Sequence, residues 1–315
     1  MKLILHILFF FTISTNLLSQ SKESQVRAIY LDSTWAETTE ENHKYIRVVE
    51  DYFSNKNIYV FKDYFKSKKL CMIGGSSDKD ILKREGQFIY YYENGNKKAV
   101  VNYSKNNKTG IEYRWYENGN IKAELDHSKI KDADVDFKIN NYWNPQQEQK
   151  VISGNGSVDY SDENQEDIGE VKDGLPDGIW KGKNLKRKFS YIENYRKGKF
   201  ISGISTDSQG IEHQYKHLEI RPEPKKGIKD FYQYIGKNYK KTENAIANKI
   251  SGKLVLSFII DKDGSITEPK ILKSLGYGLD EEAIRVITNY NGWIPGQQKG
   301  INVRALYSIP ITVSN

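Results

Sequence analysis

Hydrophobic and polar residues alternate most regularly over residues 252–269, in the run GKLVLSFIIDKDGSITEP. Leucine, phenylalanine or isoleucine stands at every second position from Leu254 to Ile260, which predicts a strand with at least one deeply buried face. The DKDG sequence favours a tight hairpin turn, because Asp-Gly tolerates positive φ. Residues 265–273 are then predicted to return as a second strand, with Pro269 at an edge or a bulge.

A helix is predicted directly after this hairpin, because apolar residues recur there at the spacing of one helix face. The members of this stripe are Leu279, Ala283, Val286, Ile287 and Tyr290. Asp280 is placed to act as the N-cap, and the Asn-Gly pair at 291–292 is expected to end the helix.

An earlier helix and a closing strand complete the pattern. Helical spacing relates Ile228, Phe231, Tyr232, Ile235 and Tyr239. In residues 301–313, one strand face is formed by Ile301, Val303, Ala305, Tyr307, Ile309, Ile311 and Val313. The order helix, hairpin, helix, strand predicts an α+β fold, with a three-stranded antiparallel sheet and two helices on one side.

Four sequence runs in this region carry a resemblance to a known family. They are GKLVLSFIIDKDGSI, GLDEEAIRVI, GWIPGQQKGINVR and the closing YSIPITV. In this order and spacing, residues 227–313 resemble the C-terminal domain of the TonB family of energy transducers. One departure is that Lys240 follows Tyr239, where the family often carries a Tyr-Pro pair.

The resemblance implies a way of binding a partner. Domains of this family bind an extended segment of an envelope protein, such as an outer-membrane receptor, by adding it to a sheet edge. The last strand, residues 301–313, is the candidate edge, and backbone groups would supply most of the affinity. The candidate partner-binding residues along it are Asn302, Arg304, Leu306 and Ser308.

An internal repeat precedes this module. The run GQFIYYYENGNKKAVVNY at 86–103 matches GIEYRWYENGNIKAELDH at 110–127, and their first residues are 24 positions apart. Each copy predicts a β-hairpin with an Asn-Gly turn, and neighbouring hairpins must stack to bury a face. Less regular copies occur at 62–73, 169–180 and 193–203. Together they resemble MORN-like, or antitoxin-like, repeats and define a predicted repeat domain at 59–220.

The remaining segments have weaker patterns. Residues 1–19 carry Lys2 followed by an apolar run that is short for a membrane span, so they predict a cleaved secretory signal with the mature chain beginning near Gln20 or Ser21. An uncleaved inner-membrane anchor is the alternative. Within the N-terminal segment 20–58, residues 40–52 are either a helix or the start of a strand. The polar residues 129–149 are predicted to form a loop, and 221–226 a linker before the module at 227–315.

Composition narrows the class of protein. Hydrophobic residues make up 37% of the chain and the mean hydropathy is −0.70, which is too polar for a membrane protein, while 22 tyrosines are too many for a disordered chain. Both values suit β-repeats with aromatic cores. The net charge of +7 is spread along the chain, and it favours a solvated basic surface over attraction to an anionic envelope polymer.

Candidate chemistry is sparse. The single cysteine, Cys71, excludes an internal disulfide and a cysteine-based zinc site. The DKDG run lacks the further ligands of a calcium loop, and His213 and His217 have metal-ligand spacing only in a helix. The acidic residues Asp159, Asp162 and Glu163 favour a solvated loop over a cation site. We therefore expect no catalytic residues, metal, cofactor or nucleic-acid partner.

Three functions follow from these observations. The first is a non-enzymatic periplasmic TonB-like protein that binds an envelope partner, such as an outer-membrane transporter, by strand addition. The second is a structural adaptor whose repeats bind the cell wall or another protein. The third is a membrane-anchored energy transducer for outer-membrane transport. An enzyme is the least favoured class, because no convergent catalytic set is visible.

Overall fold

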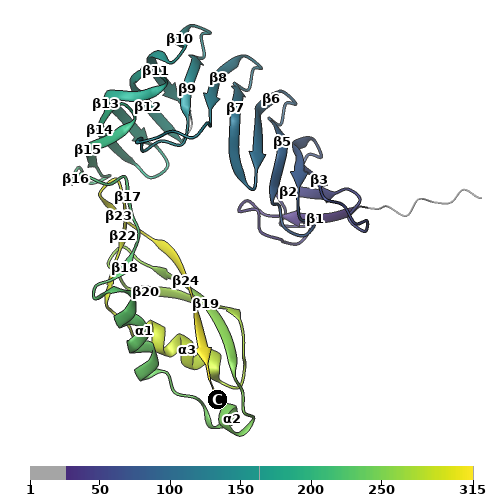
Figure 1. Ribbon diagram of the computed structural model, residues 1–315, viewed down its shortest axis with the longest axis vertical. Helices are drawn as coiled ribbons and strands as arrows, with labels where there is room; N and C mark the ends of the chain where they lie inside the picture. Colours follow the sequence, from purple (N-terminus) through teal and green to yellow (C-terminus); the bar gives the residue numbers. More distant parts are fainter. Residues whose placement is uncertain (1–25, 163, 315) are drawn as a thin grey trace, which may run out of the picture. The chain divides into compact units, whose positions relative to one another are not determined.

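A computed structural model describes residues 26–162 and 164–314 of the protein (Figure 1). The predicted signal at 1–19, the proposed start of the mature chain and Glu163 lie outside the described residues. The chain divides into two compact units between Lys108 and Thr109.

The first unit is an antiparallel meander in which each strand pairs with the next. Its strands are β1 (Arg27–Leu31), β2 (Tyr45–Val49), β3 (Tyr59–Phe65), β4 (Leu70–Ser76), β5 (Arg84–Tyr91) and β6 (Lys97–Ser104). The segment 40–52, for which helix and strand were both open, therefore contains a strand. The core is formed by Val49, Tyr59, Phe61, Met72, Phe88 and Val101.

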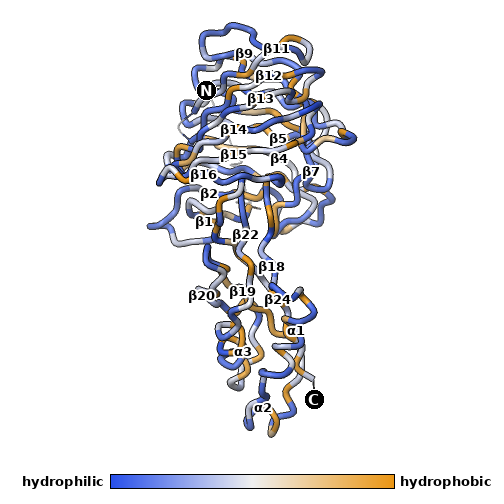
Figure 2. Tube along the Cα trace, turned by 90° about the vertical axis from the view of Figure 1, so that its left-hand side faces the viewer, coloured by the Kyte–Doolittle hydropathy of each residue, from blue (hydrophilic) through white to orange (hydrophobic). Residues whose placement is uncertain are grey.

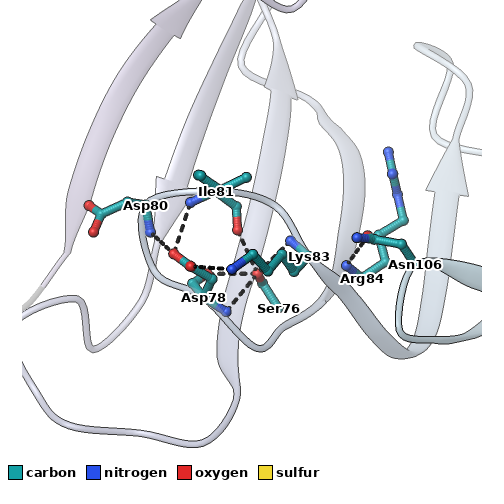
Figure 3. A network of polar contacts seen from close by, with 7 residues as sticks. All are labelled: Ser76, Asp78, Asp80, Ile81, Lys83, Arg84 and Asn106. Atoms are coloured by element: carbon teal, nitrogen blue, oxygen red, sulfur yellow. Dashed lines mark hydrogen bonds and ion pairs between the residues drawn. The ribbon is translucent and has the colours of Figure 1, made fainter. Parts of the chain in front are cut away.

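The connection between β4 and β5 is ordered by a polar network (Figure 3). The Asp78 carboxylate accepts hydrogen bonds from Lys83 Nζ at 2.8 Å and from the backbone N–H of Asp80 at 2.9 Å and of Ile81 at 3.2 Å. These hydrogen bonds lower the pKa of Asp78 to about 2, and the one from Lys83 has the largest effect. The buried Ser76 hydroxyl accepts from the backbone N–H of Lys83 at 3.0 Å. The loop therefore has a defined conformation, because the side chains of Asp78 and Ser76 accept hydrogen bonds from its backbone N–H groups.

The second unit begins with a longer antiparallel meander in which consecutive strands also pair. Its strands are β7 (Asn107–Trp115), β8 (Ile121–Asp126), β9 (Lys138–Trp143), β10 (Gln149–Ile152), β11 (Asn155–Ser161), β12 (Gln165–Lys172), β13 (Leu175–Asn184), β14 (Phe189–Arg196), β15 (Lys199–Thr206) and β16 (Glu212–Tyr215). The loop prediction for 129–149 was wrong over β9. This strand is half polar, but it pairs with β8 and buries Tyr142.

The two best repeat copies form the predicted hairpins, β5–β6 and β7–β8, with the same turn. The N–H of Gly95 donates to the carbonyl of Tyr92, and the N–H of Gly119 donates to that of Tyr116, both at 2.9 Å. Gly95 and Gly119 have φ of 95° and 89°, a conformation that favours glycine. The Asn-Gly turn prediction is therefore confirmed in both copies.

At some strand positions a glycine of one strand makes room for an aromatic ring of the neighbouring strand. A Cβ on Gly169 in β12 would come within 2.2 Å of the Trp180 ring in β13, and one on Gly203 would come within 2.2 Å of the Tyr215 ring. The ring lies over the glycine backbone, where no side chain could fit. This pairing explains the glycines at these two strand positions, whereas Gly86 and Gly110, the first residues of the two best repeat copies, have positive φ and no atom within 4 Å of an added Cβ.

The C-terminal module has the predicted α+β fold. Its elements are α1 (Gly227–Asn238), α2 (Glu243–Ala247), β19 (Gly252–Ile260), β20 (Ile266–Lys273), α3 (Leu279–Thr288) and β24 (Ala305–Val313), with sheet order β20-β19-β24. The core contains the predicted stripe of α3 together with Phe231 and Ile235 from α1 and alternate residues of β19 and β24. Hydrophobic positions recur among α1, α3 and β24 in Figure 2. The short α2 is an addition to the predicted order.

The predicted N-cap of α3 was wrong. The helix begins at Leu279, and its N-cap is Gly278 with φ of 80°. Asp280 instead turns back to the preceding loop, where its carboxylate accepts from the Ser274 hydroxyl and from the Leu275 N–H at 3.1 Å. The carboxylate therefore fixes the loop before the helix. The helix ends at Thr288, short of the predicted Asn-Gly pair.

Short strands connect the meander to the module within the second unit. They are β17 (Glu219–Ile220), β18 (Glu223–Pro224), β21 (Trp293–Ile294), β22 (Gly296–Gln298) and β23 (Ile301–Val303). β17 pairs with β22, which pairs with β23, and β18 pairs with β21. The segment predicted as a linker, 221–226, thus contributes a strand. The single strand predicted for 301–313 is split at Arg304 into β23 and β24.

Candidate partner-binding edge

β24 offers a regular edge to solvent. It pairs with β19 without a bulge from Gly252↔Val313 to Ile260↔Ala305. Its odd-numbered side chains face the core, with Ile309, Ile311 and Val313 buried, which confirms the predicted face from residue 305 onward. Within the described residues, no strand pairs with its other side, so β24 ends the sheet (Figure 1).

Pro310 fixes the direction in which the backbone groups of β24 point. It lies opposite Val255, and it has no N–H to donate to β19. Its nitrogen therefore points away from β19, toward the unpaired side of β24. Because successive residues of a strand alternate in direction, Leu306, Ser308 and Thr312 direct their N–H and C=O groups to the same free side. The edge can thus pair fully at 306 and 308, and it lacks a donor at 310.

The opposite edge of the sheet is irregular. β20 pairs with β19 through two register shifts, and Glu268 beside Pro269 has φ of 51°. Bulges and prolines disrupt the even spacing of hydrogen bonds that an incoming strand requires. Of the two edges, β24 is therefore the one that can accept an added strand.

The four predicted edge residues fall into two pairs. Leu306 is 69% exposed and Ser308 is also exposed, and both belong to the free edge of β24. Asn302 lies in β23, and its amide donates to the carbonyl of Lys262 at 2.9 Å. Arg304 contacts Asp261 at 3.2 Å and Glu268, and its hydrogen bond to Glu268 raises the pKa of the guanidinium. Asn302 and Arg304 thus hold the β19–β20 turn, while Leu306 and Ser308 are available to a partner.

An aromatic cluster packs against the core-facing side of β24. Trp293 is 1% exposed, and its ring centroid lies 4.8 Å from that of Tyr307 and 5.2 Å from that of Phe231 in edge-to-face arrangements. Phe258 in β19 lies 6.0 Å from the same indole. Such contacts add to the free energy of burial, so they hold the edge strand in a fixed position.

The other candidate chemistry has structural roles. The DKDG run is a hairpin turn, in which the N–H of Gly264 donates to the carbonyl of Asp261 at 2.9 Å. His213 lies in strand β16, so its spacing to His217 is not helical, and its imidazole contacts Asp207 at 2.9 Å. Asp162 accepts from backbone N–H groups of its own loop. These side chains order turns and loops.

The comparisons with known proteins agree with this geometry. Residues 242–312 match the family model described as Gram-negative bacterial TonB protein C-terminal. No curated protein matches the chain. The matched segment contains α2, β19, β20 and α3 and nearly all of β24, so this part of the module is similar to the TonB C-terminal domain in sequence. Among residues 26–162 and 164–314, no helix has the length and apolarity that a membrane span requires.

Pro310 is the site residue that sequence reasoning missed. The run YSIPITV contains a proline within an alternating strand pattern, and such a proline is a signal for an edge strand. In β24, this proline indicates that the strand has a free edge, and that the backbone N–H donors of this edge remain at 306 and 308 but not at 310.

Proposed function

We propose that this protein binds an extended segment of an envelope protein by adding it as a strand to β24. The observation that carries this proposal is the regular edge of β24, which has no pairing strand within the described residues and keeps its backbone donors at Leu306 and Ser308. The TonB C-terminal match makes an outer-membrane receptor or transporter the first candidate for the partner. Backbone hydrogen bonds supply the affinity in this mode of recognition.

Site-specific photo-crosslinking in the bacterial envelope tests the proposal. A photoreactive residue placed at Leu306 of the full chain is expected to crosslink to an extended segment of an outer-membrane receptor. Ser308→Pro should weaken that crosslinking about tenfold, because it removes a donor from the free edge and places a ring there. Ser308→Ala keeps the backbone and should retain the crosslink.

The matched control is a photoreactive residue at Ile246 in α2, which is 58% exposed and distant in sequence from the edge. Equal crosslinking from both positions would show that β24 has no special role. A Ser308→Pro variant that crosslinks like the parent would also rule out strand addition, provided that both proteins have the same melting temperature.

The adaptor function is favoured by a different surface. Ile168, Ile179, Ile192 and Ile204 are 39–60% exposed on four consecutive strands, β12 to β15, and Ile192 lies directly opposite Ile204. Clustered exposed aliphatic side chains mark interaction surfaces. A photoreactive residue at Ile192 that crosslinks to a partner, with none at Leu306, would favour the adaptor.

We further propose that the protein acts in the periplasm after export, without a connection to an inner-membrane motor. The composition of residues 1–19 supports a cleaved signal. Mass spectrometry is expected to find a mature N terminus near Gln20 or Ser21. An intact Met1 on a protein that resists alkaline extraction from the inner membrane would instead support the energy-transducer alternative.

A further inference from the structure

A cavity of about 600 Å³ is lined by residues of the short strands β17, β22 and β23 in the second unit. Its walls come from residues 219–222, 296–298 and 303–305, together with Arg187 and Lys262. This volume is in the range of small-molecule sites. The cavity reaches the first residue of β24, Ala305, but neither Leu306 nor Ser308 of the free edge lines it.

Three cations reach this cavity from separate parts of the chain. Arg187 precedes β14, Arg221 follows β17, and Lys262 lies in the β19–β20 turn. In the part of the chain that the structure describes, none of these three side chains has a carboxylate within ion-pair distance. By contrast, Arg285 and Arg304 of the same module are each paired with a carboxylate. The three positive charges are therefore available to pair with an anion that binds in the cavity.

Neutral groups hold two of these cations in place. Arg187 donates to the side-chain oxygen of Gln298, which orients the guanidinium without neutralising its charge. The Asn302 amide donates to the Lys262 carbonyl at 2.9 Å and fixes the turn that carries the ammonium group. A second cavity of about 470 Å³ shares Arg187, Lys262 and Gln297, so both cations are accessible from two sides.

The acidic groups near the cavity do not cancel this charge. Glu219 is the carboxylate on its wall. In the neighbouring cavity, Asp207 is bound by His213 at 2.9 Å. Arg304 also lines the first cavity but is occupied by Asp261 and Glu268. Three uncompensated cations therefore face one carboxylate.

We propose that this cavity binds a small ligand through its anionic oxygens, carboxylate or phosphate, held by Arg187, Arg221 and Lys262. A guanidinium fork pairs two oxygens of such a group, and an ammonium adds a point charge. The site draws on the meander and on the C-terminal module, so an occupied site would connect them. It does not depend on strand addition at β24.

Isothermal titration calorimetry of the full chain tests this inference, with citrate as the carboxylate probe and pyrophosphate as the phosphate probe at constant chloride. One of the two probes is expected to bind, and the stronger one identifies the chemistry. Arg221→Gln combined with Lys262→Gln should raise its Kd about tenfold or more, because two charge-assisted contacts are lost. Glu219→Gln should lower the Kd several-fold, because the opposing charge is removed.

Matched controls separate the cavity from the general charge of the protein. Lys216→Gln and Glu212→Gln change exposed charges outside this cavity and should leave the Kd unchanged. No heat of binding for either probe at millimolar concentration would overturn the proposal. Equal Kd values for the parent and the double variant would also overturn it, and so would control variants that alter the Kd as much as the cavity variants do.

Discussion

Trp293→Ala is expected to lower the free energy of unfolding of the second unit by about 3–5 kcal/mol. The indole is 1% exposed and contacts the rings of Phe231, Phe258 and Tyr307, which come from three different elements. Truncation therefore loses the burial of a large side chain and leaves a cavity beside β24. Chemical denaturation of the full chain, followed by circular dichroism, measures the change.

Two further variants make this test specific. Leu306→Ala, at a side chain that is 69% exposed, should change the free energy by less than about 0.5 kcal/mol. Trp293→Phe should cost less than Trp293→Ala, because the ring contacts are partly kept and the buried indole N–H, which has no hydrogen-bond partner among the described residues, is removed. A loss below about 1 kcal/mol for Trp293→Ala would mean that the indole is not part of the core.

Local periodicity accounts for the parts of the fold that could be predicted. The hairpin of β19 and β20 and the stripe of α3 have regular apolar spacing, and tertiary contacts agree with it. β9 was missed because the run KINNYW has too few apolar residues to show alternation, although pairing with β8 makes it a strand. The five-residue α2 has no room for a stripe, and its only sequence signal is Thr242, whose hydroxyl accepts from the N–H of Ala245 at 3.2 Å.

Features of the candidate site depend on contacts between distant residues. Apolar residues occupy every odd-numbered position from 301 to 313, so the local sequence does not predict that the strand is divided at Arg304. The break occurs where this guanidinium meets Asp261 and Glu268 of the β19–β20 hairpin. Likewise, Arg187, Arg221 and Lys262 are far apart in the sequence. They line one cavity because β22 pairs with β17 and contacts Arg187 through Gln298, while Asn302 of β23 contacts the Lys262 carbonyl. Sequence spacing alone cannot predict such an arrangement.

The turn between β22 and β23 places a lysine in the meander. Lys299 Nζ pairs with the carboxylate of Glu193 in β14, whose side chain is 3% exposed, and lies 3.7 Å from the centroid of the Tyr191 ring. The Lys299 carbonyl accepts from the Ser205 hydroxyl at 2.7 Å. Glu193 also accepts from the Tyr215 hydroxyl at 2.6 Å, and burial, followed by this hydrogen bond, raises the pKa of that phenol, so it stays a donor.

Lys299→Met should therefore cost about 3–5 kcal/mol of unfolding free energy in the second unit, because it leaves the Glu193 carboxylate buried without its counter-charge. The double variant Lys299→Met/Glu193→Gln should recover part of this loss, since the unpaired charge is removed as well. Lys253→Met, at an exposed position of β19, is the matched control and should change stability by less than about 0.5 kcal/mol. Denaturation of the parent, Lys299→Met, Glu193→Gln and the double variant gives the coupling energy, and strictly additive losses from the two single changes would show that Lys299 and Glu193 do not stabilise each other.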